Sequence, residues 1–186
     1  MAILNIFNMK IPLLLLMSFA ALGARSQTTT AAANGPNPQY LNNIYYWNAD
    51  SLRPLEKTNG QIKNKMRYFG GGGGTNYVMD GPRSPVRIKA DANTRFAVRL
   101  SGMMDPSSLI KLYRFDGGKK SREASVSQGN KDLIDCNVQK SGADVYILIP
   151  TTKLSPGEYG FQNAMMMNGA GSTNMSYTLF AFGVDQ

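Results

Sequence analysis

Residues 86–100 read VRIKADANTRFAVRL, and this stretch carries the clearest β-strand pattern of the chain. On both sides of a short connection at 90–94, apolar residues alternate with basic ones. A period of two residues is the pattern of a β-strand with one buried face. The stretch therefore predicts an antiparallel hairpin with one apolar face and one basic face.

Further strand-like segments lie on either side of this hairpin. Apolar or alternating runs occur at 44–47, 109–115, 133–138, 145–149, 159–162 and 177–184, with Gly, Pro, Asn and Asp between them. These residues favour turns, and no long amphipathic helical pattern separates the runs. We therefore expect an all-β domain over residues 40–186, a single antiparallel β-sandwich of immunoglobulin-like type.

Residues 154–159 read LSPGEY and stand between an apolar run and the next strand. This segment resembles the tyrosine corner of immunoglobulin-like and fibronectin-type sandwiches, which implies that Leu154 and Tyr159 belong to the core. Together with FAFGVD at 180–185, it is also similar to the C-terminal third of uncharacterised exported bacterial β-sandwich proteins. That resemblance implies an envelope protein and transfers no catalytic residue.

Residues 1–26 predict a signal peptide that is removed on export. Lys10 precedes an apolar stretch from Ile11 to Leu22, and small residues follow at Ala24 and Ser26, where a signal peptidase would cut. The stretch is short for a membrane span, so we expect none after cleavage. Residues 27–39 are polar and predict a flexible linker. The protein is therefore expected to be secreted or periplasmic, and an association with the outer surface of the cell stays open.

The chain contains no histidine, and Cys136 is its only cysteine. Ser-His-Asp and Cys-His catalysis are excluded, as are the usual zinc sites and any disulfide within the chain. The carboxylates are scattered and show no spacing typical of an acid–base pair. We expect a non-enzymatic protein without a metal or cofactor, although a hydrolase that works without histidine stays open. Cys136 is expected to be buried and inert.

The formal net charge of +8 at pH 7 favours anionic partners. The basic face of the predicted hairpin is the first candidate site for a partner or anionic surface component, and its cations are Arg87, Lys89, Arg95 and Arg99. Such cations can form charge-assisted hydrogen bonds with a polyanion, or they can simply keep the sheet face solvated. Nucleic acid is disfavoured, because no aromatic residue of the predicted hairpin shares that face with these cations.

Two small-ligand alternatives remain. Tyr45 and Trp47 can stack on the rings of a glycan, unless they fill the core. The thioethers of Met165, Met166, Met167 and Met175 can bind Cu(I), unless they act as apolar filler. The sequence thus predicts an exported binding or structural protein that contacts another envelope component through the basic sheet face or the methionine-rich loop. A small-ligand binder is the alternative.

Overall fold

A computed structural model describes residues 35–49, 51–65, 74–102, 105–126, 130–168 and 176–186. Within these residues the chain forms β-strands and one short helix, α1 (Pro106–Leu109). The prediction of an all-β domain is therefore confirmed. No helix in this part of the chain is long and apolar enough to cross a membrane.

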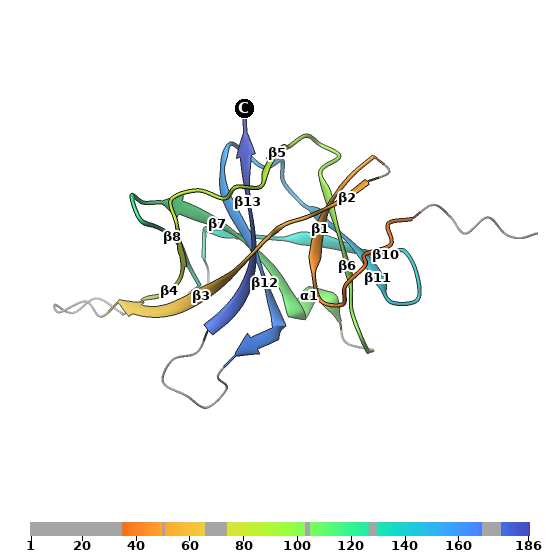
Figure 1. Ribbon diagram of the computed structural model, residues 1–186, viewed down its shortest axis with the longest axis horizontal. Coiled ribbons are helices and arrows are strands. Elements are labelled where there is room, and N and C mark those ends of the chain that lie inside the picture. The colour runs from red at the N-terminus through yellow and green to blue at the C-terminus, as the bar shows by residue number, and fades with distance from the viewer. Residues whose placement is uncertain (1–34, 50, 66–73, 103–104, 127–129, 169–175) are drawn as a thin grey trace, which may run out of the picture. The chain divides into compact units, whose positions relative to one another are not determined.

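Six strands form an antiparallel sheet that closes on itself, a barrel-like arrangement (Figure 1). In order around this closed sheet they are β12 (Gly157–Asn168), β13 (Ser176–Asp185), β3 (Glu56–Lys65), β4 (Gly74–Asp80), β8 (Ser121–Ser125) and β7 (Ile110–Gly117). The sheet closes because β12 pairs with both β13 and β7. Two short strands lie beside it: β5 (Arg87–Lys89) runs parallel to β13, and β9 (Leu133–Ile134) pairs with β7.

A second, open sheet contains five antiparallel strands. In spatial order they are β10 (Cys136–Lys140), β11 (Val145–Pro150), β6 (Arg95–Arg99), β1 (Ile44–Asn48) and β2 (Ser51–Pro54). The finer prediction, a single immunoglobulin-like sandwich, is not confirmed. Such a sandwich packs two open sheets, whereas here one of the two sheets closes on itself.

Two apolar cores stabilise this arrangement, and β13 contributes to both. Its side chains alternate, so that Phe180 and Phe182 lie in the core between the sheets while Leu179 and Ala181 lie inside the closed sheet. The core between the sheets also contains Ile44, Phe96, Val98, Leu112, Leu148 and Phe161. The interior of the closed sheet contains Tyr77, Met79, Tyr113, Phe115 and Tyr177.

The tyrosine corner expected at 154–159 is present. The hydroxyl of Tyr159 donates a hydrogen bond to the carbonyl oxygen of Ser155, 2.7 Å away. Tyr159 is 1% exposed, Leu154 is buried, and the Tyr159 ring stacks on Phe182 with a centroid distance of 5.5 Å. The short loop before β12 is therefore fixed from within the core.

The predicted hairpin over residues 86–100 is wrong, although both of its strands exist. Strand β5 pairs with β13, whereas β6 pairs with β1 and β11 in the other sheet. A turn in which the backbone N–H of Asp91 donates to the hydroxyl of Thr94 joins them. The alternation fixes which face of a strand is buried, but it does not select the neighbouring strand.

The domain begins before Tyr40. Residues 35–39 of the predicted linker are described, and Pro36 and Pro38 are buried there. The backbone N–H of Tyr40 then donates to the hydroxyl of Tyr45, at 3.3 Å. The predicted signal peptide and residues 27–34 lie outside the described residues.

Candidate functional site

The face of the open sheet that points away from the core brings several candidate residues together. Tyr46 packs on Phe96 in the core, so the adjacent residues of β1 and β6 point outward. The register places Trp47 opposite Arg95 on one side and opposite Leu52 on the other. We define the outer face by its partly exposed side chains, which are Trp47, Leu52, Arg95, Ile147 and Ile149.

Arg95 and Trp47 form a cation–π pair on this outer face. The guanidinium carbon lies 4.1 Å from the centroid of the indole ring. A pair at a partly exposed site contributes about 0.5–1 kcal/mol, and it also limits the freedom of both side chains. The charge of Arg95 is therefore held at a defined position beside apolar surface.

Aliphatic and amide side chains complete the outer face. Ile147 and Ile149 on β11 are partly exposed, and the register pairs them with Gln139 and Asn137 on the edge strand β10. Both amide residues are exposed. The surface thus combines an apolar centre with hydrogen-bonding groups along one edge.

Tyr45, the other predicted glycan contact, is buried. It lies on the same side of the sheet as Trp47, but its hydroxyl accepts a hydrogen bond from Tyr40. The segment before β1 thus passes over the Tyr45 side of the sheet. Trp47 is therefore the partly exposed aromatic side chain of the outer face, whereas Tyr45 stabilises the segment that leads into β1.

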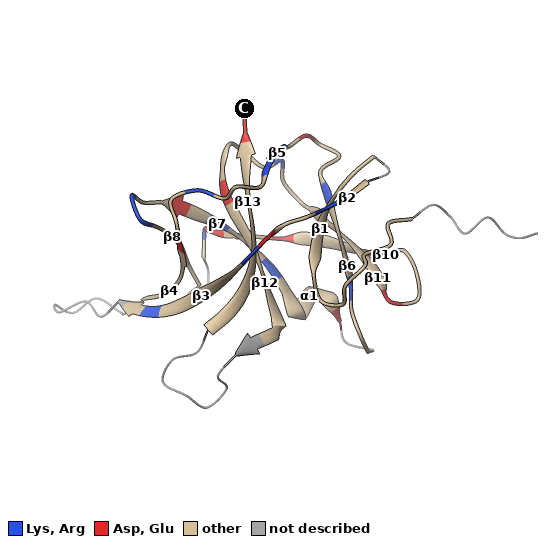
Figure 2. Cartoon of the chain, in the orientation of Figure 1, with Lys and Arg blue, Asp and Glu red and all other residues tan. Residues whose placement is uncertain are grey.

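The four cations predicted to share one face are divided between two strands in different sheets. Arg95 and Arg99 lie on β6, and Arg87 and Lys89 lie on β5. Arg99 forms an ion pair with Asp144, with Nε 2.6 Å from Oδ2. Figure 2 shows basic segments on both strands. The set is therefore not one continuous basic face.

A buried group of charges, which sequence reasoning missed, lies inside the closed sheet. The side chain of Arg122 is 0% exposed and donates to both carboxylate oxygens of Glu56, at 3.2 and 3.3 Å. It also donates to the backbone carbonyls of Gly81 and Asp80, each at 3.1 Å. The buried charge is thus fully hydrogen-bonded.

This group continues through Glu158 to β5. The carboxylate of Glu158 accepts from the backbone N–H of Ser84 at 2.8 Å, from Arg122 at 3.5 Å, and from Arg87. Arg87 also donates to Asp185 at 2.7 Å, and this hydrogen bond lowers the pKa of the carboxyl group. We call Glu56, Arg122, Glu158, Arg87 and Asp185 the charge network.

The charge network lies at one end of the closed sheet. Its acids and Arg122 stand near strand ends: Glu56, Arg122 and Glu158 at the starts of β3, β8 and β12, and Asp185 at the end of β13. Because the strands are antiparallel in this order, these strand ends lie at the same end of the sheet. Arg87 joins them from β5, which pairs with β13. Gly183 has no side chain, and the Arg87 guanidinium occupies the space where a Cβ at this position would lie. The end of the closed sheet is therefore filled by ordered charges.

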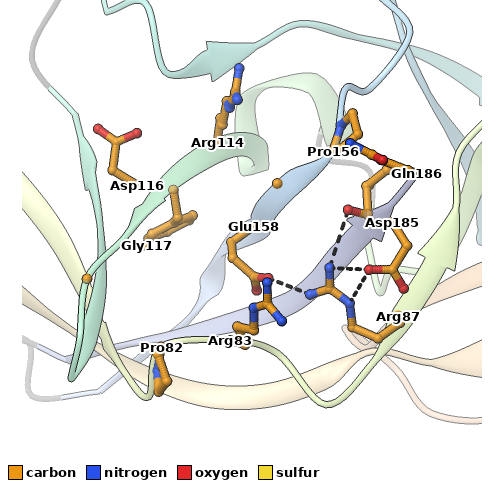
Figure 3. Close-up of a pocket in the computed structure, with 14 residues that line it drawn as sticks. Pro82, Arg83, Arg87, Arg114, Asp116, Gly117, Pro156, Glu158, Asp185 and Gln186 are labelled. Carbon is orange, nitrogen blue, oxygen red and sulfur yellow. Dashed lines mark hydrogen bonds and ion pairs between the residues drawn. The ribbon is translucent and has the colours of Figure 1, made fainter.

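Beside the charge network lies a pocket of about 620 Å³ (Figure 3). Residues from four segments line it, including Arg83, Arg87, Arg114, Asp116, Gly157, Glu158 and Asp185. Arg83 and Arg114 are exposed, and in Figure 3 they lie on opposite sides of Glu158. This pocket was not anticipated from the sequence.

The methionines predicted as a Cu(I) site are only partly described. Met165 is 37% exposed, whereas Met166 packs against the core between the sheets. The side chain of Met167 and all of Met175 lie outside the described residues. Within the described part, no group of three or more His, Cys, Asp or Glu residues could hold a metal ion.

Cys136 is free and lies against the core between the sheets. Burial raises the pKa of its thiol to about 12. The thiol therefore stays protonated near neutral pH, but Cys136 is partly exposed and not fully buried as expected, and its inertness stays a prediction.

The fold and surfaces described above define an all-β protein with one closed and one open sheet. Comparison with models of protein families, with curated proteins and with solved structures gives no match for this chain.

Proposed function

We propose that this protein is an exported, non-enzymatic binding protein that contacts another protein of the cell envelope through the outer face of the open sheet. The observation that carries the proposal is the cation–π pair of Arg95 and Trp47 beside the partly exposed Leu52, Ile147 and Ile149. Tryptophan and arginine dominate the binding energy of many protein interfaces. Export is proposed from the signal-like segment, and the lack of histidine supports a role without catalysis.

The chemistry of the outer face indicates the kind of partner. Its centre is apolar, and Arg95 presents a fixed positive charge. A partner with an apolar patch next to a carboxylate would complement both features. Removal of residues 1–26 takes away Lys10 and Arg25 but no acidic residue, so the exported chain keeps a positive net charge that would speed the encounter with an acidic protein. The tyrosine corner also supports a relation to immunoglobulin-like sandwiches, which fits a binding role.

A glycan is the second candidate ligand for the same face. Trp47 is partly exposed, and the amides of Asn137 and Gln139 lie along the edge of the sheet. Aromatic rings stack on sugars, and amides hydrogen-bond with hydroxyl groups. Tyr45 has no part in this candidate, because its side chain is buried.

Site-specific crosslinking tests the protein–protein proposal. We would place a photoreactive benzoylphenylalanine at Ile149 on the outer face, and at Lys119 in the turn between β7 and β8 as a matched control. A discrete protein adduct is expected only from position 149. Equal labelling from both positions, or none from position 149, would overturn the proposal.

The purified partner then provides a quantitative test. Trp47 is the only tryptophan, so its fluorescence reports directly on the outer face. We expect Arg95→Ala to weaken the binding of the partner about tenfold, while Lys119→Ala leaves it unchanged. A fluorescence change with envelope oligosaccharides, and none with the crosslinked protein, would favour the glycan candidate instead.

A further inference from the structure

Another pocket, of about 410 Å³, lies between the segment before β1 and the connection from β2 to β3. Its floor is apolar, because Ile44, Leu55 and Phe180, which are all buried, line it. This volume is within the range of small-molecule sites, and such sites combine an apolar floor with a few polar groups. The pocket contains no member of the charge network, and it shares only Leu52 with the outer face.

One wall of this pocket is a stiff segment that presents amide side chains. Residues 36–39 read PNPQ, and both prolines are buried, whereas Asn37 and Gln39 are exposed and line the pocket. Proline fixes its own φ and keeps the preceding residue extended, so the alternating burial places the two amides on the same side of the segment. The backbone N–H of Tyr40 donates to the hydroxyl of Tyr45 and thereby attaches the end of the segment to β1. Little ordering is therefore needed when a ligand enters.

The polar side chains of the rim are available to a ligand. Within the described residues, the side chains of Asn37, Gln39, Tyr40 and Asn43 form no hydrogen bond with the protein. Each amide can both donate and accept hydrogen bonds. Tyr40 is 58% exposed and places an aromatic ring at the rim. A ligand with several hydroxyl groups would therefore find partners without displacing internal contacts.

Among the described residues that line the pocket, Lys57 is the only charged one. It lies opposite Phe180 in the register of β3 and β13, so the two side chains share a face of the closed sheet. The preceding residue, Glu56, points to the other face, where it binds Arg122. Lys57 is exposed and forms no ion pair with a carboxylate of the described residues. A positive charge without a competing acid thus borders the pocket.

We propose that this pocket binds a short saccharide that carries a carboxylate, of the uronic acid type. The ring of Tyr40 stacks on a sugar ring, and the amides of Asn37 and Gln39 exchange hydrogen bonds with its hydroxyl groups. The carboxylate forms charge-assisted hydrogen bonds with the ammonium group of Lys57. A purely apolar ligand would leave the amides without partners, which favours a ligand rich in hydroxyl groups. This proposal does not depend on the outer face as a protein interface.

Digalacturonate is the first probe, titrated by calorimetry and by NMR of the side-chain amide signals at low ionic strength. We expect the NH₂ signals of Asn37 and Gln39 to shift most. Lys57→Met should weaken binding about tenfold. Lys63→Met, at an exposed lysine on the same face of β3 but outside the pocket, should not. The methyl ester of the disaccharide, which lacks the charge, should bind the parent as weakly as digalacturonate binds Lys57→Met.

Further probes separate the possible results. A disaccharide of glucuronate and N-acetylglucosamine, and sialyllactose, present the carboxylate on other sugars. Trp47→Ala should bind the saccharide normally, so failure of the outer-face proposal would be seen separately. Lys57 is exposed, so an unchanged thermal midpoint will confirm that Lys57→Met folds.

Three results would overturn the saccharide site. The first is the absence of shifts at Asn37 and Gln39 with every acidic probe at millimolar concentration. The second is equal affinity of Lys57→Met and the parent. The third is a shift of the Asn137 and Gln139 signals in place of those of Asn37 and Gln39, which would put the sugar on the outer face instead.

Discussion

Arg122 and Glu56 form a two-pronged ion pair inside the closed sheet, with Nη1 3.2 Å from Oε2 and Nη2 3.3 Å from Oε1. The two residues come from β8 and β3, which are not neighbours, because β4 lies between them. The pair therefore links strands that share no backbone hydrogen bonds. A buried pair of this kind is costly to break from one side, because the remaining charge is left without a partner.

Arg122→Met should destabilise the protein by about 3–5 kcal/mol, since it leaves Glu56 and Glu158 near each other without their shared cation. Urea unfolding followed by circular dichroism measures the change. Adding Glu158→Gln to Arg122→Met should restore part of the loss, and Lys119→Met should change stability by less than about 0.5 kcal/mol. A loss for Arg122→Met no larger than this control would contradict the role given to the pair.

Gly183→Ala should act through Arg87. The new methyl group would collide with the guanidinium, which can move only by leaving Glu158 and Asp185. We therefore expect the double variant Gly183→Ala/Arg87→Met to be less destabilised than the sum of the two single variants. Additive unfolding free energies would show that the methyl group is accommodated in another way.

Tyr159→Phe should cost about 0.5–1.5 kcal/mol, because it removes the hydrogen bond to Ser155 but keeps the ring stacked on Phe182. Tyr40→Phe, at an exposed tyrosine, is the matched control. Thermal or urea unfolding gives both values. Similar stabilities for the two variants would mean that the hydroxyl of Tyr159 does not stabilise the loop.

The ion pair between Asp185 and Arg87 should make the free energy of unfolding depend on pH. Its hydrogen bond lowers the pKa of Asp185 in the folded protein. A lowered pKa means that the stabilisation is present at neutral pH and is lost as the pH falls through the folded-state pKa. Asp185→Asn should therefore be less stable than the parent at neutral pH, and the difference should shrink in strong acid. A difference that is constant over this range would contradict the assignment.

Cys136 should react slowly with thiol reagents while the protein is folded. Burial raises the pKa of the thiol to about 12, so little thiolate is present near neutral pH. Ellman's reagent should label it much more slowly in the folded protein than in urea. Rapid labelling of the folded protein, at the rate of a free cysteine, would show that the thiol is accessible.

Much of the strand content can be predicted from the alternation of apolar residues. Strands were expected at 44–47, 109–115 and 177–184, and the structure has β1, β7 and β13 there. The corner at Tyr159 was recognised because its residues are close in sequence and interact locally. Strands β2 and much of β3 were missed, because their polar residues at 51–61 resemble a loop.

Pairing and the charged interior could not be predicted. Strand β5 joins β13 across a sequence separation of almost one hundred residues, and alternation carries no information about such partners. Arg122 occurs in SREAS, where the only signal is that it shares a strand face with Ala124. The acids that make its burial possible come from β3 and β12, so the fold itself is needed to see the site.

Strand β13 contributes side chains to both apolar cores, and this affects how the protein unfolds. Phe180 and Phe182 anchor this strand in one core, and Leu179 and Ala181 anchor it in the other. Detaching β13 from either core would therefore expose apolar surface in both cores. Only Asp135 separates β9, on the closed sheet, from β10 in the open one, so the two sheets are also joined along the chain. We therefore expect one cooperative transition, in which the most protected amides of both sheets exchange with the same opening free energy.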